Sequence, residues 1–169
     1  MVHTKQKPMY LHGLEGSPKG TKGAWMVQHY GAHAPEMPAK MANPDAFEES
    51  YQIAAEAVRS LQPNLIVASS FGGAVLLKLV HEKVWTGPCV FLAQAGIKYG
   101  LDARLPAGTH AILIHAEEDK LVPFADSMKI AEASGSQVEL WPTGGNHKLH
   151  HITTDGTLKR AVEQLLPKD

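Results

Sequence analysis

The sequence predicts an α/β fold: a mostly parallel sheet of about six strands, covered by helices on both faces, in one domain over residues 1–169. Three observations predict it. Short apolar runs alternate along the chain with segments of helical periodicity. The run at 65–68 is apolar throughout, as expected for a strand with both faces covered. No repeat or linker divides the chain, and its length fits one domain.

Five apolar runs predict strands, and a sixth run is a weaker candidate. The weak candidate is 40–42, which follows Pro38 and precedes Asn43 and Pro44. The other expected strands are 9–11, 65–68, 89–93, 111–115 and 138–141.

Helices are expected between these strands. One runs over about 22–30, and a clearer one begins at Asp45, where Glu48 completes a capping box, and stops at Pro63. Residues 72–83 are apolar nearly all round, which predicts a buried helix. A further helix follows Pro123, and the last amphipathic helix carries apolar residues at helical spacing: Leu158, Val162, Leu165 and Leu166.

Composition limits the classes of partner. Apolar residues make up 44% and charged residues 20%, and the formal net charge is −1, so neither nucleic acid nor a membrane surface is expected as partner. Residues 1–8 are polar, and no stretch nears the ~18 apolar residues that span a bilayer, so a cytoplasmic location is expected. The single Cys89 lies in an apolar run and is expected to be inert. The ten histidines form no HExxH pattern, so neither a metal nor a cofactor is expected.

A serine pair lies between the strand expected at 65–68 and the helix that follows. Ser70 has the small residue Ala68 two positions before it and Gly72 two positions after it. A nucleophile elbow needs such small residues, because its serine sits on a sharp, strained turn. The helix N-terminus also favours the negative charge of an oxyanion. The motif predicts Ser70 as nucleophile, with the side chain of Ser69 expected to point away from the pocket.

An acid and a histidine follow two later strands. Asp119 comes just after the strand at 111–115, and His147 lies in a glycine-rich loop after the last strand. The carboxyl ends of parallel strands share one edge, so these loops can converge on Ser70. The order Ser, Asp, His is that of α/β-hydrolases. We therefore expect His147 as the base and Asp119, rather than the three other acids nearby, as the group that orients it; those acids are Glu117, Glu118 and Asp126.

With these motifs the chain resembles the α/β-hydrolase superfamily, and within it the small, cap-poor YqiA-like esterases. The matching segments are 10–14 with Ser17 and Pro18, 68–73, 119–123 and 145–147. The resemblance implies the α/β-hydrolase fold without a cap domain. It also implies an oxyanion hole made by the backbone N–H groups of Leu14 and Phe71.

The expected activity is hydrolysis of a small-molecule carboxylic ester through an acyl-enzyme. A thioesterase or amidase with the same residues, and a non-catalytic binding protein of this fold, are the alternatives. Residues 94–108 leave no room for a folded lid, so an open pocket that favours short acyl chains is expected. Met26, Ile97, Tyr99 and Leu121 are candidates to line it, and Lys19 or Lys22 is a candidate to hold an anionic substrate. The sequence does not indicate an oligomeric state.

Overall fold

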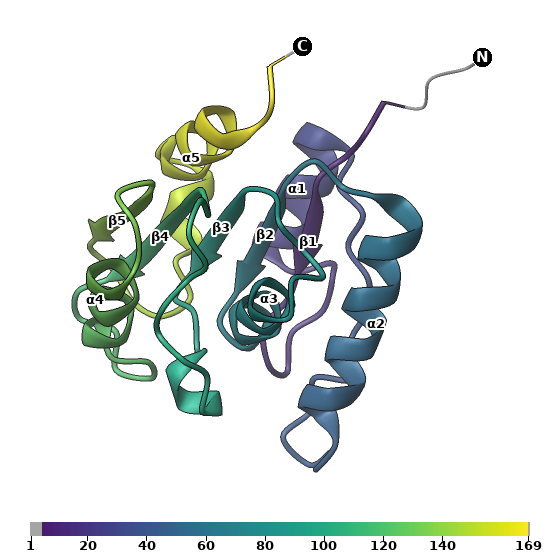
Figure 1. The fold of residues 1–169 in the computed structure, drawn as a ribbon, viewed down its shortest axis with the longest axis horizontal. Coiled ribbons are helices and arrows are strands. Elements are labelled where there is room, and N and C mark those ends of the chain that lie inside the picture. Colours follow the sequence, from purple (N-terminus) through teal and green to yellow (C-terminus); the bar gives the residue numbers. More distant parts are fainter. Residues whose placement is uncertain (1–4, 169) are drawn as a thin grey trace.

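The computed structural model describes residues 5–168. Its centre is a sheet of five parallel strands in the order β1-β2-β3-β4-β5, so each strand pairs with its neighbours in the sequence (Figure 1). The strands are β1 (Met9–Leu11), β2 (Ile66–Ser69), β3 (Cys89–Leu92), β4 (Ala111–Ala116) and β5 (Val138–Thr143).

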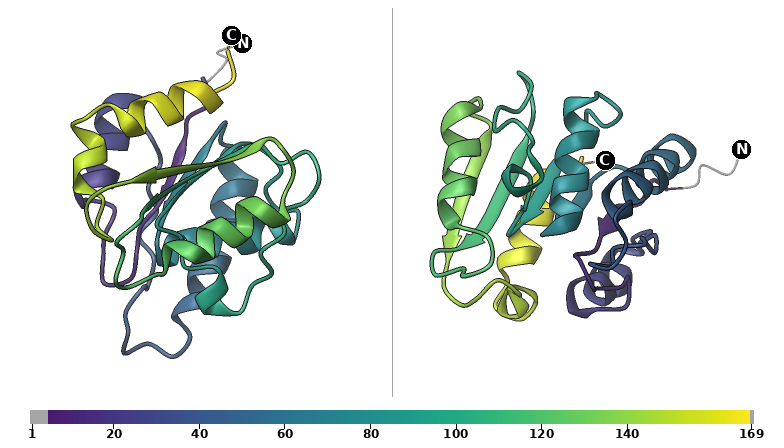
Figure 2. Two further views of the ribbon diagram at one scale, coloured as in Figure 1. Left: turned by 90° about the vertical axis from the view of Figure 1, so that its left-hand side faces the viewer. Right: turned by 90° about the horizontal axis from the view of Figure 1, so that it is seen from below.

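Helices cover both faces of this sheet, as the sequence predicts (Figure 2). One face carries α1 (Thr21–Tyr30) and α5 (Thr157–Leu165), with the short 3-10 helix η2 (His150–Thr153) beside them. The other face carries α2 (Ala46–Leu61), α3 (Phe71–His81) and α4 (Phe124–Ala133).

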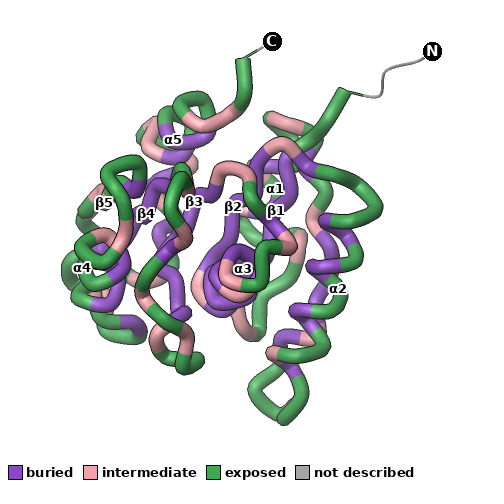
Figure 3. Tube along the Cα trace, viewed as in Figure 1, coloured by how far each residue is buried: buried purple, intermediate pink, exposed green. Residues whose placement is uncertain are grey.

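The two faces hold two separate hydrophobic cores because side chains alternate along each strand. In β1, Met9 and Leu11 point to the core beneath α2 and α3, whereas Tyr10 points to the core beneath α1 and α5. Strands β1 to β4 are therefore buried on both sides, as Figure 3 shows by their colour, whereas most residues of the edge strand β5 are half-buried or exposed. Cys89 is fully buried in this sheet, and burial raises the pKa of its thiol to about 12, which fits the expected inert thiol.

The expected sixth strand at 40–42 is wrong. Those residues form a turn, in which the N–H of Asn43 donates to the carbonyl of Lys40 (3.0 Å). The edge of the sheet beside β1 is instead met by His33, which forms one parallel bridge with Met9. The ladder stops there because the next donor in register is Pro35, which has no N–H.

The capping box expected at the start of α2 is also absent. The side chain of Asp45 makes no capping hydrogen bond; its own N–H donates to Asn43 Oδ1 (3.0 Å). Glu48 turns instead towards α3, where it accepts a hydrogen bond from Lys78 Nζ (3.1 Å). A tertiary ion pair has replaced the local cap, and the helix itself forms as expected.

The chain carries no cap domain within the described residues. Between β3 and β4 lies one turn of 3-10 helix, η1 (Ile97–Tyr99), followed by a loop. In residues 5–168 no helix is long and apolar enough to cross a membrane. The same part of the chain holds no cluster of three or more His, Cys, Asp or Glu residues suited to a metal ion.

Candidate active site

Ser70 lies at the sharp turn between β2 and α3. Its backbone has φ 52° and ψ −112°, a conformation that non-glycine residues rarely adopt. The turn can pack this closely because Gly72 has no side chain: a Cβ there would lie 2.3 Å from the carbonyl oxygen of Leu11. The strained geometry directs the Ser70 side chain towards the carboxyl edge of the sheet, as in a nucleophile elbow.

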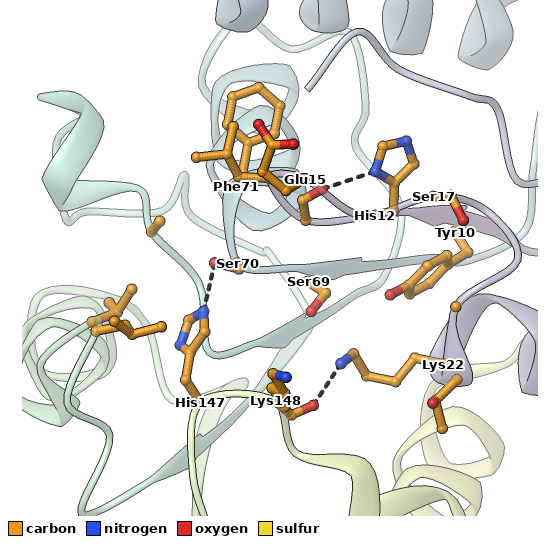
Figure 4. Close-up of a pocket in the computed structure, with 18 of the residues that line it drawn as sticks. Tyr10, His12, Glu15, Ser17, Lys22, Ser69, Ser70, Phe71, His147 and Lys148 are labelled. Atoms are coloured by element: carbon orange, nitrogen blue, oxygen red, sulfur yellow. Dashed lines mark hydrogen bonds between the residues drawn. The ribbon is translucent and has the colours of Figure 1, made fainter. Parts of the chain in front are cut away.

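The structure brings Ser70, His147 and Asp119 together. Ser70 Oγ lies 2.8 Å from His147 Nε2, and His147 Nδ1 lies 2.7 Å from Asp119 Oδ2. Figure 4 shows the first of these contacts. A carboxylate can only accept, so His147 Nδ1 carries the ring proton and Nε2 is free to accept from the Ser70 hydroxyl. This is the geometry in which an imidazole can take the proton of a serine hydroxyl while a carboxylate orients the ring.

Backbone hydrogen bonds hold the Asp119 carboxylate in place in addition to its contact with His147. Its side chain is fully buried, and Oδ1 accepts hydrogen bonds from the backbone N–H groups of Leu121 and Val122, both at 2.8 Å. Burial raises the pKa of Asp119, but these N–H groups and His147 outweigh it, so the pKa lies below its usual value. Asp119 is thus a carboxylate at neutral pH.

The competing acids have other positions. Glu117 and Glu118 are exposed, and Asp126 lies in α4. Of these four acids, Asp119 is the one paired with His147.

A second histidine, which sequence reasoning missed, lies on the other side of Asp119. His115 in β4 is completely buried, and its Nε2 lies 2.9 Å from the carbonyl oxygen of Val122 and 3.2 Å from Asp119 Oδ2. Because a carbonyl only accepts, Nε2 carries the proton. Burial lowers the pKa of His115, which is therefore neutral. The signal that could have found it is a polar residue inside the apolar run at 111–116.

His115 is itself held by a buried chain of hydrogen bonds. Its Nδ1 accepts from the hydroxyl of Ser127 (2.7 Å), and Ser127 Oγ accepts from Gln94 Nε2 (3.0 Å). Gln94 Oε1 then accepts from the backbone N–H of Gly96 (2.7 Å). This network connects α4 and the loop after β3 to the carboxylate of Asp119.

The two backbone groups expected to form an oxyanion hole flank the pocket that contains Ser70. Leu14 follows β1 and Phe71 begins α3, and within residues 5–168 neither N–H donates a hydrogen bond. His12 holds the first loop in place. Its Nε2 accepts from the N–H of Met37 (2.9 Å), so its Nδ1 carries the proton and donates to the carbonyl of Gly13 (2.9 Å).

The pocket beside Ser70 has a volume of about 790 Å³, within the usual range for small-molecule sites. Two of the expected lining residues, Tyr99 and Leu121, are there. The other two are not: Met26 is a completely buried residue of α1 in the core on the α1 and α5 face, and Ile97 packs against the core under α2 and α3.

The same pocket shows where the polar side chains singled out in the sequence lie. Of the two candidate lysines, Lys22 lines the pocket, and Lys19 is exposed outside it. The side chain of Ser69 was expected to point away, and this is wrong: Ser69 lies in the pocket wall near Tyr10 (Figure 4). The turn aims the side chain of Ser70 at His147 and leaves that of Ser69 along another wall of the same cavity.

Comparison with known proteins identifies the fold. No protein-family model and no curated protein matches the chain. Solved structures do match over nearly its whole length. A candidate hydrolase of the α/β superfamily from Xanthomonas campestris superposes with a TM-score of 0.79, covering 95% of this chain and 98% of that one at 20% identity. The chain has the α/β-hydrolase fold.

Two further solved structures also superpose on most of the chain. One is an α/β serine hydrolase without a lid from Xanthomonas campestris, at 16% identity and a TM-score of 0.66, covering 100% of this chain and 87% of that one. The other is an esterase domain from a Rhodothermus marinus protein, at 14% identity and a TM-score of 0.65, covering 96% of this chain and 86% of that one.

Proposed function

We propose that this chain is a serine hydrolase that cleaves small-molecule carboxylic esters through an acyl-enzyme. The observation that carries the proposal is the unbroken set of contacts from Ser70 Oγ through His147 to the buried Asp119, set on a strained turn at the mouth of a pocket. The fold neighbours that are a serine hydrolase without a lid and an esterase domain support the reaction class. The resemblance to YqiA-like esterases points the same way.

In this mechanism His147 removes the proton from Ser70 as Oγ attacks the carbonyl carbon of the ester. The carbonyl oxygen becomes an oxyanion, which the N–H groups of Leu14 and Phe71 stabilise; such a donor contributes about 10²–10³-fold to rate. His147 then gives the proton to the departing alcohol oxygen, and the acyl group stays on Ser70. Water attacks the acyl-enzyme, with His147 again as base, and releases the acid. Asp119 holds the ring in the required tautomer throughout.

Short acyl chains are the proposed preference. The apolar end of the pocket is formed by Phe71, Tyr99 and Leu121, and Leu121 is 62% exposed while Tyr99 is 38% exposed. Each methylene that is buried contributes about 0.8 kcal/mol, but only where a protein surface covers it. With one short turn between β3 and β4 and no lid, a long acyl chain would remain largely in water.

A panel of substrates tests the proposal. We expect hydrolysis of p-nitrophenyl acetate and butyrate, weaker activity on the matched thioesters and amides, and no gain towards palmitate. The Ser70→Ala variant should lose this activity while keeping its melting temperature. If thioesters or amides are turned over faster than esters, the substrate would be assigned to that class instead. A steady rise in kcat/KM with chain length would point to a covered acyl tunnel.

A further inference from the structure

One end of the Ser70 pocket is polar, and the ester chemistry proposed above does not use it. The ammonium group of Lys22 and the hydroxyls of Ser69 and Tyr10 line this end (Figure 4). Lys22 Nζ donates to the carbonyl oxygen of Lys148 at 2.6 Å. Lys148 directly follows the base His147, and Ser69 directly precedes the nucleophile Ser70. The polar end is therefore anchored one residue away from each of the two reacting groups.

The charge around this pocket is positive, although the chain as a whole has a formal net charge of −1. Three lysines line the pocket: Lys22, Lys98 and Lys148. The one carboxylate in its lining is Glu15, which lies 3.6 Å from the ammonium of Lys40. A concave surface lined mainly by one sign of charge attracts ligands of the opposite sign.

Lys22 also lacks a counter-ion within the described part of the chain. It forms none of the ion pairs found among residues 5–168. Burial, with a smaller contribution from the positive charge of Lys148, lowers the pKa of Lys22 to about 8. A partly desolvated ammonium with one carbonyl partner has further N–H donors to offer, and an anion would compensate both its charge and its lost hydration.

The two hydroxyls complete a set of donors. Burial raises the pKa of the Tyr10 phenol, and the neighbouring Ser69 only partly counters this, so Tyr10 remains a neutral hydroxyl. Neutral hydroxyls can donate to anionic oxygens without adding a competing negative charge. Together with an ammonium they suit the several acceptor oxygens of a carboxylate or a phosphate.

We propose that the substrate is an ester carrying an anionic oxygen group, a carboxylate or a phosphate, and that Lys22, Ser69 and Tyr10 bind this group. The inference rests on the proposed ester hydrolysis and specifies its substrate class. Ser70 and His147 act on the ester bond, while the ammonium of Lys22 holds the charged group a short distance away.

Paired esters that differ in charge test this proposal. In the acyl half, p-nitrophenyl hydrogen succinate is compared with p-nitrophenyl butyrate; in the alcohol half, para-acetoxybenzoate is compared with para-acetoxybenzamide. We expect the wild type to prefer the anionic member of at least one pair. Lys22→Gln should reduce that preference, measured as a ratio of kcat/KM values, by about tenfold to a hundredfold, the contribution of a hydrogen bond to a charged group.

The matched control is Lys19→Gln, which removes an exposed lysine from the turn just before α1 and should leave the ratio unchanged. Lys22 also connects α1 to the loop of His147 through Lys148, so a structural role is the competing explanation. In that case Lys22→Gln would slow both members of each pair equally, and the proposal would be overturned. The same follows if the wild type shows no preference in either pair, nor in the corresponding pairs in which a phosphate replaces the carboxylate. A preference that Lys22→Gln reduces for the phosphorylated esters but not for the carboxylated ones would identify the anion as a phosphate.

A binding measurement separates failure of this inference from failure of the proposed activity. The Ser70→Ala variant is titrated with p-nitrophenyl hydrogen succinate and para-acetoxybenzoate in a calorimeter, with and without Lys22→Gln. If Lys22→Gln weakens the binding of either ester by at least about tenfold, the anion site is supported even when no ester is turned over. If Lys22→Gln leaves the binding of both esters and of their phosphorylated counterparts unchanged, the anion site is contradicted, whatever the wild type hydrolyses.

Discussion

His115 Nε2 lies 3.2 Å from Asp119 Oδ2, the same carboxylate oxygen that contacts His147 Nδ1 at 2.7 Å. One oxygen is thus approached by two imidazoles, one that faces Ser70 and one that is completely buried. The buried ring is neutral and also donates to the carbonyl of Val122 (2.9 Å). We interpret His115 as a positioning residue, which fixes where the Asp119 carboxylate points.

Replacing this histidine should therefore slow catalysis. His115→Leu fills the buried site with an apolar side chain and removes the N–H beside Asp119. We expect kcat to fall by about tenfold to a hundredfold with KM nearly unchanged, because small displacements of a catalytic group cost rates of this order. Steady-state kinetics with p-nitrophenyl acetate measures it.

Ser127→Ala is the matched control for His115→Leu. It removes the hydroxyl that donates to His115 Nδ1 and accepts from Gln94, but leaves the contact between His115 and Asp119. Its free energy of unfolding should fall by about 1–3 kcal/mol because buried partners lose a hydrogen bond. If both variants lower kcat equally, the role of His115 is structural rather than specific to the carboxylate.

Asp119→Asn should reduce kcat by about 10⁴-fold, as in other enzymes that lose this carboxylate. The amide can still accept from Leu121 and Val122 through its oxygen, but its NH₂ group then faces the N–H of His147. The ring must adopt the wrong tautomer to avoid the clash. Glu118→Gln, an exposed neighbour, should retain normal activity. A loss below about tenfold for Asp119→Asn, with Glu118→Gln far worse, would assign the role to Glu118.

Gly72→Ala should disrupt the turn that presents Ser70. The added methyl would lie 2.3 Å from the carbonyl oxygen of Leu11 and 2.6 Å from that of His12, so β1 and α3 must separate. We expect a loss of about 1–3 kcal/mol in the free energy of unfolding, the usual cost of overpacking, measured by urea denaturation. Gly144→Ala, in the loop before His147, meets open space and should be neutral. Equal stability of the two variants would contradict the close packing at the turn.

The preference for anionic esters should depend on pH. Lys22 has a pKa of about 8, lowered by burial and by Lys148, so its positive charge is complete below that pH and is lost as the pH rises through it. Besides Lys22 and Lys148, the charged or titratable groups of the pocket lining are Tyr10, His12, Glu15, Lys98, Tyr99, His147 and His150. The ratio of kcat/KM for an anionic and a neutral ester cancels any effect of pH on the catalytic groups that both reactions share. We expect this ratio to fall around pH 8 in the wild type and to stay flat in Lys22→Gln; a flat ratio in the wild type would contradict the assignment.

The fold was largely predictable because four of its five strands are buried on both faces and its helices are amphipathic or wholly apolar. Five of the six expected strands are present, and the convergence of the loops after β2, β4 and β5 follows from the parallel sheet. The edge was not predictable. The sequence at 40–42 offers no stronger strand signal than that around His33, and only the tertiary pairing with β1 decides between them.

The convergence of Ser70, Asp119 and His147 was predictable, because each of them follows the carboxyl end of a parallel strand. The surroundings of a residue were not predictable where the direction of its side chain matters. Met26 was expected in the pocket and lies in the core, whereas Lys22, one turn earlier on the same face of α1, lines the pocket together with the loop that precedes the helix. The proposed role of His115 depends on its contact with Asp119. The spacing of four residues between them in the sequence does not reveal this contact.

Covalent labelling with a fluorophosphonate tests the central claim most directly, since the probe reacts only with a serine that a base has activated. We expect one adduct per chain, mapped by mass spectrometry to Ser70. Ser70→Ala should abolish it, and Ser69→Ala, which alters the same pocket wall, should retain it. An adduct on Ser69, or no adduct on the folded wild-type chain, would contradict the assignment of Ser70 as the nucleophile.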